Sequence, residues 1–236
     1  MLDPNGRTVM ISGANRGFGR ALAQHLLDEG YNVSAGMRRP AEGASALDGP
    51  SERLAIHPYE ATDGPSGDAW LEATVDRFGG LDVLVNNAGI VESSPLEDLS
   101  EERLDDLWLV NVKAPFRMIK AALPHLRAAG SGRVVNLSSL SGLRVKGAFA
   151  PGYAISKFAV TALTEAAKNA GWDDGVRVTS VHPGFINTDM VADFDYPAED
   201  MIQPEDLAEV VATVLRLPNT AQVGRLTVAC ELEPGF

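Results

Sequence analysis

The chain has 236 residues, and its composition, 45% hydrophobic and 22% charged, is that of an ordinary globular protein. Its 32 acidic residues outnumber its 20 basic ones, and the resulting net charge of −12 argues against broad binding to nucleic acid or to an anionic membrane surface. A single cysteine, Cys230, excludes an intramolecular disulfide, and no apolar run approaches the roughly 20 residues that span a bilayer.

Short apolar segments alternate with longer helical patterns along the chain. The strand candidates are Thr8–Ser12, Asn32–Gly36, Leu54–Pro58, Leu81–Asn86, Arg133–Ser138, Arg177–His182 and Gly224–Ala229. The helix candidates are Gly17–Glu29, Trp70–Phe78, Ser100–Leu126, Tyr153–Gly171 and Pro204–Leu215. This alternation predicts a doubly wound, Rossmann-type α/β fold with a seven-stranded, mostly parallel sheet and helices on both faces. Nothing divides residues 1–236 into domains, and the irregular segment 185–203 is predicted to be a substrate lid.

A glycine-rich turn follows the first strand, in Ser12-Gly13-Ala14-Asn15-Arg16-Gly17-Phe18-Gly19. Glycines let the backbone approach a diphosphate closely, and the helix after the turn offers free N–H groups and a partial positive charge. The spacing G-x-x-x-G-x-G differs from the fingerprint G-x-G-x-x-G, and a lone glycine-rich turn also occurs without a ligand. We predict that the turn binds a dinucleotide through Gly13, Asn15, Arg16, Gly17, Phe18 and Gly19.

The end of the second strand indicates which dinucleotide binds. NAD sites commonly place Asp or Glu about 20 residues after the turn, to bind the ribose 2′-hydroxyl. Here the strand is followed by Met37, Arg38 and Arg39, with no acid. Guanidinium groups suit a 2′-phosphate because they bind it in bidentate fashion. The sequence therefore predicts NADP(H) in preference to NAD(H), which remains possible; the alternative is that both arginines are solvated loop charges.

A tyrosine and a lysine four residues apart open the fourth predicted helix. The spacing places Tyr153 and Lys157 on the same helical face, one turn apart. A nearby ammonium favours the phenolate, so we expect Lys157 to lower the pKa of Tyr153 from about 10 and to make it a usable general acid and base. By itself the pattern Y-x-x-x-K is more often a surface pair.

Other polar residues follow the predicted strands, at the sheet edge where open α/β folds bind ligands. They are Asn86-Asn87-Ala88-Gly89, Asn136-Leu137-Ser138-Ser139 and His182-Pro183-Gly184 with Thr188, while Asn111 lies in a helical stretch. Together the glycine turn, N-N-A-G, Y-x-x-x-K and P-G-x-x-x-T resemble the short-chain dehydrogenase/reductase family, in its compact single-domain branch. The resemblance extends from Thr8 to about Val228.

The resemblance implies a catalytic set of Asn111, Ser139, Tyr153 and Lys157. Tyr153 would protonate the carbonyl oxygen during reduction, and Lys157 would lower its pKa and hold the nicotinamide ribose. Ser139 would hydrogen-bond the substrate oxygen, and Asn111 would hold a water that links Lys157 to solvent.

The serine assignment leaves alternatives, because Ser138 and Ser141 lie close to Ser139. The resemblance also implies further cofactor contacts beyond the glycine turn and the two arginines. These are Glu60, Ala61, Asn87, Ala88, Gly89, Tyr153, Lys157, Pro183, Gly184 and Thr188. The family usually has Asp where Glu60 stands.

The predicted activity is hydride transfer between an NADP(H) nicotinamide and a small-molecule carbonyl or secondary alcohol, of the carbonyl reductase or alcohol dehydrogenase type. One alternative is a non-catalytic NADP(H)-binding sensor. Another, a sugar-nucleotide epimerase or dehydratase, is disfavoured by the three-residue gap between Gly13 and Gly17.

Metal, partner and location complete the expectations. The four scattered histidines predict no metal site. The family habit implies a homodimer or homotetramer, formed through helices 104–126 and 153–171. The N-terminal segment lacks a basic region followed by an apolar run, so we expect no signal peptide and a cytoplasmic protein.

Overall fold

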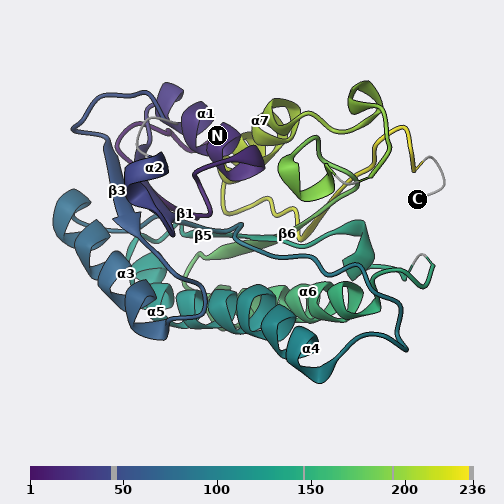
Figure 1. Ribbon diagram of the computed structural model, residues 1–236. Helices are drawn as coiled ribbons and strands as arrows, with labels where there is room; N and C mark the ends of the chain where they lie inside the picture. The colour runs from purple at the N-terminus through teal and green to yellow at the C-terminus, as the bar shows by residue number, and fades with distance from the viewer. Residues whose placement is uncertain (44–46, 146, 193, 234–236) are drawn as a thin grey trace.

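The computed structural model describes residues 1–43, 47–145, 147–192 and 194–233 (Figure 1). Within these ranges, seven strands form one sheet in the order β3-β2-β1-β4-β5-β6-β7, and every neighbouring pair is parallel. The strands are β1 (Thr8–Ser12), β2 (Asn32–Met37), β3 (Leu54–Pro58), β4 (Val83–Asn86), β5 (Arg133–Leu137), β6 (Arg177–Pro183) and β7 (Arg225–Val228).

Helices connect the strands in the described parts of the chain. They are α1 (Gly17–Asp28), α2 (Pro40–Gly43), α3 (Gly64–Phe78), α4 (Glu101–Trp108), α5 (Ala114–Ala128), α6 (Pro151–Gly171) and α7 (Pro204–Leu215). A π-helical turn, Leu109–Lys113, joins α4 to α5, and short 3-10 turns lie at Leu140–Gly142, Asp189–Val191 and Ala198–Asp200. No helix in these ranges is long and apolar enough to cross a membrane.

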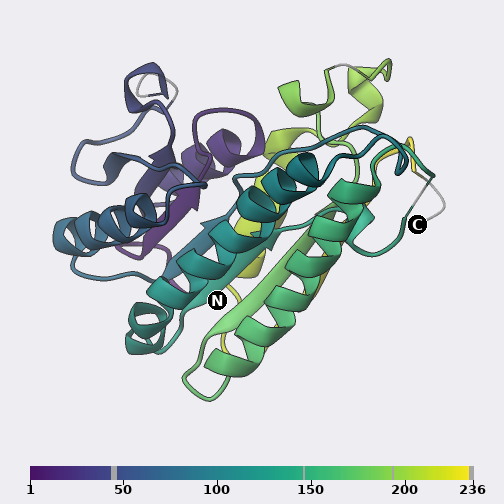
Figure 2. The same cartoon turned by 60° about the horizontal axis from the view of Figure 1, so that its bottom comes forward.

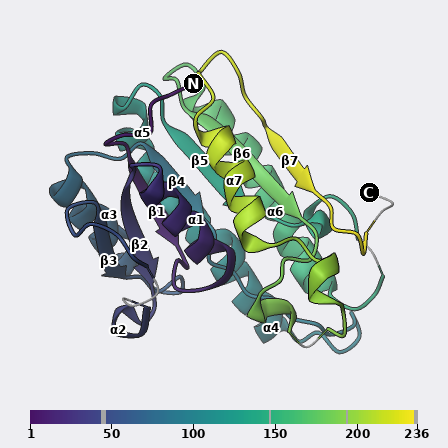
Figure 3. The same cartoon turned by 90° about the horizontal axis from the view of Figure 1, so that it is seen from above.

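The helices cover both faces of the sheet. Helices α1 and α7 lie side by side on one face, and α3 to α6 lie on the other (Figures 1 and 3). Because successive strand residues point to opposite faces, Val9 and Ile11 of β1 pack in the core beneath α1 and α7, whereas Met10 packs with Trp70 in the other core. Burial on both faces explains why the central strands read as continuous apolar runs. The predicted doubly wound α/β fold is confirmed.

The order of the strands sets where a ligand can bind. From β1 the chain proceeds to β2 and β3 on one side, and it then returns to place β4, β5, β6 and β7 on the other. The direction of winding therefore reverses between β1 and β4. In open α/β sheets this switch point, at the carboxyl ends of the strands, is where ligands bind.

Two of the predicted helices differ most from their predicted bounds. Helix α3 begins at Gly64, six residues before the predicted start at Trp70, with Pro65 in its first turn. The predicted helix 100–126 contains the π-helical turn, and Pro115 lies in the first turn of α5, where its missing N–H costs no hydrogen bond. Pro124 lies within α5 and does not end it.

The segment 185–203 is closed at its base by backbone pairing. Ile202 N–H donates to Phe185 O at 2.9 Å, and Asn187 N–H donates to Ile202 O at 2.9 Å. Between these contacts lie the two 3-10 turns of the segment. Asp193 lies outside the described residues. The ends of the segment are thus held together, as in a compact surface loop.

Buried Tyr31 provides a prediction about stability at alkaline pH. Burial raises the pKa of Tyr31 to about 12, above its ordinary value of 10.0. The folded state therefore keeps a proton that the unfolded state loses above pH 10, so this contribution to stability is present below pH 10 and is lost as the pH rises toward 12. In urea unfolding, the free energy of unfolding of the wild type should fall by about 1.4 kcal/mol per pH unit in this window because of Tyr31, and Tyr31→Phe should not show this fall. The partly exposed Tyr196→Phe serves as the control, and equal pH slopes for Tyr31→Phe and the wild type would contradict the assignment.

Candidate active site

The turn between β1 and α1 depends on its glycines. Gly13 and Gly17 have φ angles of 69° and 52°, in the left-handed region that other residues rarely adopt. A Cβ atom on Gly19 would lie 2.4 Å from Gly13 O and 2.3 Å from Asn87 Nδ2. The start of α1 can therefore lie against the turn only because residue 19 has no side chain.

The turn is held to the loop after β4 by hydrogen bonds. Asn87 Nδ2 donates to Ser12 O at 2.8 Å and to Gly13 O at 3.1 Å. Ser12 Oγ accepts from the backbone N–H groups of Asn87 and Ala88, both at 3.0 Å. Sequence analysis singled out Asn87 but not Ser12, whose position at the end of an apolar strand beside the switch point was the available signal. These contacts fix the two loops on either side of the switch point relative to each other.

The amino end of α1 fits a diphosphate. No side chain caps it, and its first turn contains no acidic residue. Its backbone N–H groups and the positive end of its dipole therefore suit an anion. Thr188 lies near the same turn, since a Cβ on Gly17 would be 3.0 Å from its Cγ2. The glycine cradle and the uncapped helix thus match the phosphate-binding part of a dinucleotide site.

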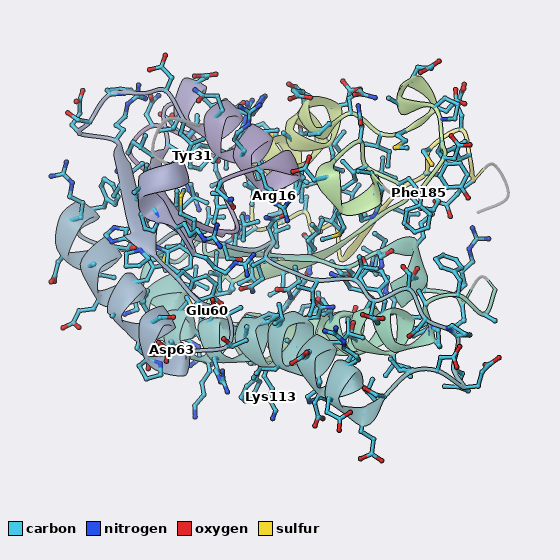
Figure 4. All side chains as sticks on the ribbon, in the orientation of Figure 1. Arg16, Tyr31, Glu60, Asp63, Lys113 and Phe185 are labelled. Carbon is cyan, nitrogen blue, oxygen red and sulfur yellow. The ribbon has the colours of Figure 1, made fainter. Side chains whose placement is uncertain are left out.

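The charged residues predicted around the cofactor lie along the same edge. Arg16 is labelled in Figure 4. Its Nη1 forms an exposed ion pair with Asp189 Oδ2 at 3.0 Å, which links the glycine turn to segment 185–203. Arg38 and Arg39 are exposed immediately after β2. Glu60 Oε1 accepts from Thr62 N–H at 3.3 Å and so stabilises its own loop.

Three further predicted contacts differ in what they can offer a ligand. Asn15 is exposed in the glycine turn. The side chains of Phe18 and Ala61, by contrast, are buried in the two hydrophobic cores. Only backbone atoms of Phe18 and Ala61 could therefore contact a cofactor.

The structure brings Tyr153 and Ser139 together. Tyr153 lies in the first turn of α6, Ser139 follows β5, and their side chains are hydrogen-bonded. Ser138 is buried, with its Oγ donating to Lys157 O at 3.0 Å. The backbone N–H of Ser141 donates to Ser139 Oγ at 3.1 Å. Of the three serines, Ser139 is therefore the one whose hydroxyl contacts the tyrosine.

Lys157 is buried beside the tyrosine. Its Nζ donates to Leu137 O at 2.7 Å and lies 5.5 Å from the centre of the Tyr153 ring. Burial lowers the pKa of Lys157 to about 8. The same amine approaches the loop after β4, since a Cβ on Gly89 would lie 3.7 Å from Nζ.

The predicted lowering of the Tyr153 pKa by Lys157 is wrong. Burial raises the pKa of Tyr153 to about 12, and the hydrogen bond with Ser139 acts in the lowering direction. The reason is geometric, because Lys157 Nζ lies over the ring and is hydrogen-bonded to Leu137 O. The four-residue spacing brings the two side chains together, but it does not make the ammonium the dominant influence on the phenol.

Asn111 lies in the π-helical turn, a type of distortion that is frequent at functional sites. Its Oδ1 accepts from Ile90 N–H, and its Nδ2 donates to Ile90 O, both at 2.9 Å. Nδ2 also lies 3.0 Å from Ser156 Oγ, which in turn donates to Tyr153 O at 2.7 Å. The amide thus joins the loop after β4 to the helix that carries the tyrosine and lysine. Ser156 was not singled out from the sequence, although it is the neighbour of Lys157.

His182 is a third residue, after Ser12 and Ser156, to which the sequence analysis gave no role in the site. It has no exposed surface, and its Nδ1 lies 3.0 Å from Ser139 O while its Nε2 lies 2.8 Å from Ser180 Oγ. Burial lowers the pKa of His182 below its ordinary value, so it is neutral at pH 7. Pro183 ends β6, and Gly184 follows it. His182 therefore supports the backbone of the serine that contacts Tyr153.

The sequence of the chain matches a known protein family. Residues 7–198 match the family model described as short chain dehydrogenase. The chain belongs to the short-chain dehydrogenase family. The resemblance inferred from its motifs is confirmed.

Among curated relatives of this short-chain dehydrogenase are two agropine synthesis reductases of Rhizobium rhizogenes. They are 42% and 40% identical over 95% and 94% of the chain, which spans about half of their length, 53% and 52%. An uncharacterized oxidoreductase of Staphylococcus haemolyticus is 32% identical over 97% of this chain and 99% of its own.

Solved structures show the same fold. A dehydrogenase/reductase of Sinorhizobium meliloti has a TM-score of 0.85 at 31% identity and covers 95% of this short-chain dehydrogenase and 94% of its own chain. A short chain dehydrogenase of Burkholderia cenocepacia, solved with NADP, has a TM-score of 0.86 at 29% identity and covers 96% and 98%. A 3-ketoacyl-(acyl-carrier-protein) reductase of Brucella melitensis, solved with NADH, has a TM-score of 0.87 at 25% identity over 96% and 98%.

Proposed function

We propose that this chain reduces a ketone or aldehyde with NADP(H), using Tyr153 as the general acid. The observation that carries the proposal is the hydrogen-bonded pair of Tyr153 and Ser139, with Lys157 Nζ 5.5 Å from the tyrosine ring. This group lies at the carboxyl edge of the sheet, the edge that also carries the glycine turn. The name of the agropine synthesis reductases supports reduction as the direction.

The protonation state of Tyr153 also supports reduction. With a pKa of about 12, the Tyr153 hydroxyl keeps its proton at neutral pH and can donate it to a carbonyl oxygen as negative charge develops there. Ser139, already hydrogen-bonded to Tyr153, would orient the same oxygen. Oxidation of an alcohol would instead require the phenolate, which burial disfavours.

A nicotinamide cofactor supplies the hydride when it is bound. The backbone of Gly13, Gly17 and Gly19 and the amino end of α1 would hold its diphosphate. Asn87, Ala88 and Gly89 would line its path, and Lys157 would hold ribose hydroxyls. Pro183, Gly184 and Thr188 would contact the nicotinamide side, and Glu60 and Ala61 the adenine side.

The experiment that tests the function is a panel of ketones, aldehydes and alcohols, followed through NADPH absorbance. Turnover of at least one carbonyl compound is the expected result. Firm NADPH binding without turnover across the panel would replace the proposal with a non-catalytic sensor. Absence of dinucleotide binding by calorimetry would overturn both.

Cofactor choice gives a separate prediction. Arg38 is exposed directly after β2, and no acid takes the place of the usual ribose ligand. Loss of a charge-assisted hydrogen bond costs about 1.5–3 kcal/mol, so Arg38→Asp should raise KM for NADPH about 10-fold to 100-fold and leave KM for NADH nearly unchanged. Arg77→Asp, at the far end of α3, is the matched control. A wild-type preference for NADH would contradict the assignment of the 2′-phosphate site.

We also propose that two copies associate through the outer face of α4, α5 and α6. These helices run side by side (Figure 2) and expose Trp108, Phe116, Ile155 and Phe158. Helix α4 is acidic over Glu101–Asp106, whereas Lys113 and Lys120 lie farther along the same rod, so an antiparallel second copy would pair opposite charges.

The oligomeric state tests this proposal. Sedimentation should show a dimer of the wild type and a monomer of Phe116→Glu, since a buried unpaired carboxylate costs several kcal/mol. Trp172→Glu, exposed at the end of α6, is the control and should remain dimeric. A monomeric wild type would sink the proposal.

A further inference from the structure

Four aromatic side chains form a contiguous cluster, which we name the aromatic wall: Phe149, Phe185, Phe194 and Tyr196. The ring centres of Phe185 lie 5.7 Å from Phe194 and 5.0 Å from Tyr196. Phe149 meets Phe194 edge-on at 6.1 Å, and Phe194 and Tyr196 are nearly parallel, with 2° between their planes. Aromatic pairs of this kind stabilise a structure by more than their buried area alone, so the contacts hold the four rings together as one surface.

The aromatic wall is built from the two segments that flank the proposed reaction position. Phe149 precedes Tyr153 by four residues, just before α6 begins at Pro151. Phe185, labelled in Figure 4, follows β6. His182 of that strand supports the backbone of Ser139. Phe194 and Tyr196 belong to segment 185–203. The wall is therefore attached, on one side, directly before the general acid and, on the other, directly after the strand that supports the serine.

Much of this apolar surface is uncovered. Phe149 is 48% exposed and Tyr196 is 43% exposed, whereas Phe185 packs against the core and anchors the wall. Val145 and Met190, in the same two segments, are also exposed. A concentration of exposed apolar side chains indicates a binding surface, and here the segments that flank the proposed reaction position carry it.

The charge of the same region limits what can bind. Segment 185–203 contains five acidic residues and no lysine or arginine. Asp189, Asp195 and Glu199 are exposed there. On the other segment, Arg144 already faces Glu233, with 3.8 Å between Nη2 and Oε1. A substrate with a carboxylate or phosphate next to its carbonyl would approach an acidic lid and be repelled.

We propose that the aromatic wall binds an aromatic ring of the substrate, and that the substrate class is a neutral aryl ketone or aldehyde. The inference rests on the proposed carbonyl reduction at Tyr153 and adds the identity of the group beside the carbonyl. The substrate ring packs against Phe149 and Phe194 while the carbonyl oxygen reaches Tyr153 and Ser139.

Four size-matched or charge-matched ketones test the substrate class with NADPH in excess. Acetophenone should exceed cyclohexyl methyl ketone in kcat/KM by about threefold to tenfold, which is the expected worth of aromatic pairing. It should exceed phenylglyoxylate, which adds a carboxylate, and dihydroxyacetone, which lacks the ring, by at least about tenfold. Equal values for acetophenone and dihydroxyacetone, or a preference for phenylglyoxylate, would overturn the inference.

Variants of the wall separate substrate contact from general damage. Phe149→Leu and Phe194→Leu should each lower kcat/KM for acetophenone about threefold to tenfold and leave butanone within about twofold. Trp172→Leu, an exposed aromatic at the distant end of α6, should change neither. Equal losses on both ketones would mean that the rings only support the fold and would overturn the inference.

A binding measurement keeps this inference distinct from the proposed function. Calorimetry with acetophenone and the NADP+-loaded protein should give a Kd that Phe149→Leu weakens by the same threefold to tenfold. If that weakening is seen but no ketone is reduced, the aromatic wall binds the ring as proposed and the proposed reduction is wrong. If ketones are reduced but acetophenone binding is unaffected by Phe149→Leu and Phe194→Leu, the proposed function stands and the inference that the aromatic wall binds the substrate ring is wrong.

Discussion

Tyr153→Phe is expected to lower kcat for ketone reduction by about 10³-fold, within the range that general acid catalysis supplies. The substitution removes only the hydroxyl, which is the group hydrogen-bonded to Ser139 and the one that holds a proton at neutral pH. The ring and its contact with Lys157 Nζ, 5.5 Å away, remain. The Kd for NADPH, measured by calorimetry, should therefore stay within about threefold of the wild type.

Two serine variants provide the comparison for this prediction. Ser139→Ala removes the hydroxyl that contacts Tyr153 and should lower kcat by about 10²-fold, the cost of losing one oriented hydrogen-bond donor. Ser138→Ala removes a structural bond to Lys157 O and should reduce the free energy of unfolding by about 1 kcal/mol while retaining most of kcat. A Tyr153→Phe enzyme within tenfold of the wild type would show that another group donates the proton.

The sheet could be predicted well because parallel strands buried on both faces leave a direct trace in the sequence. The apolar run Thr8–Ser12 matches β1 to the residue, and every residue of β1 is buried. The half-buried edge strand β3 also matches its predicted bounds, Leu54–Pro58. The start of α3 could not be predicted in this way, since Gly64-Pro65-Ser66-Gly67 is a poor helix-forming segment. Gly67 packs where a Cβ would lie 2.7 Å from Met118 Sδ, so close packing against α5, a tertiary contact, overrides local propensity.

The members of the candidate site could be predicted more readily than their energetics. Spacing along a helix places Tyr153 and Lys157 on one face, but the pKa of each depends on how much water and charge surround it in the fold. The same limit applies to His182, whose support of Ser139 O depends on the pairing of β5 with β6. A residue that acts through a neighbouring strand leaves no spacing signal in its own segment.

Lys157 carries the second large effect, because its buried ammonium is both required and costly. Its pKa of about 8 means that the amine is charged below pH 8 and neutral above it. If the charged form holds the cofactor ribose and Leu137 O, kcat/KM for reduction should fall as the pH rises through about 8. Lys157→Met should be about 10²-fold to 10³-fold less active at pH 7, without this break. Lys157→Arg stays charged, so its profile should not break near pH 8 even if its activity is low.

Stability should change in the opposite direction. The pKa of Lys157 is lowered from 10.5 by burial, so the unfolded chain binds a proton more readily than the folded one between about pH 8 and 10.5. The penalty is fully present below pH 8 and disappears as the pH rises to 10.5. The penalty for burying the ammonium is about 3 kcal/mol. Replacing Lys157 by Met removes this penalty but also loses the hydrogen bond to Leu137 O, which is worth about 1 kcal/mol. Lys157→Met should thus raise the free energy of unfolding at pH 7 by about 2 kcal/mol in urea titrations. The gain should vanish before pH 10.5, where only the loss of about 1 kcal/mol from the missing hydrogen bond remains. If Lys157→Met is inactive but more stable at pH 7, the lysine serves function, because only a functional requirement explains a buried charge without which the fold would be more stable. If the variant is both inactive and less stable at pH 7, the lysine serves the fold.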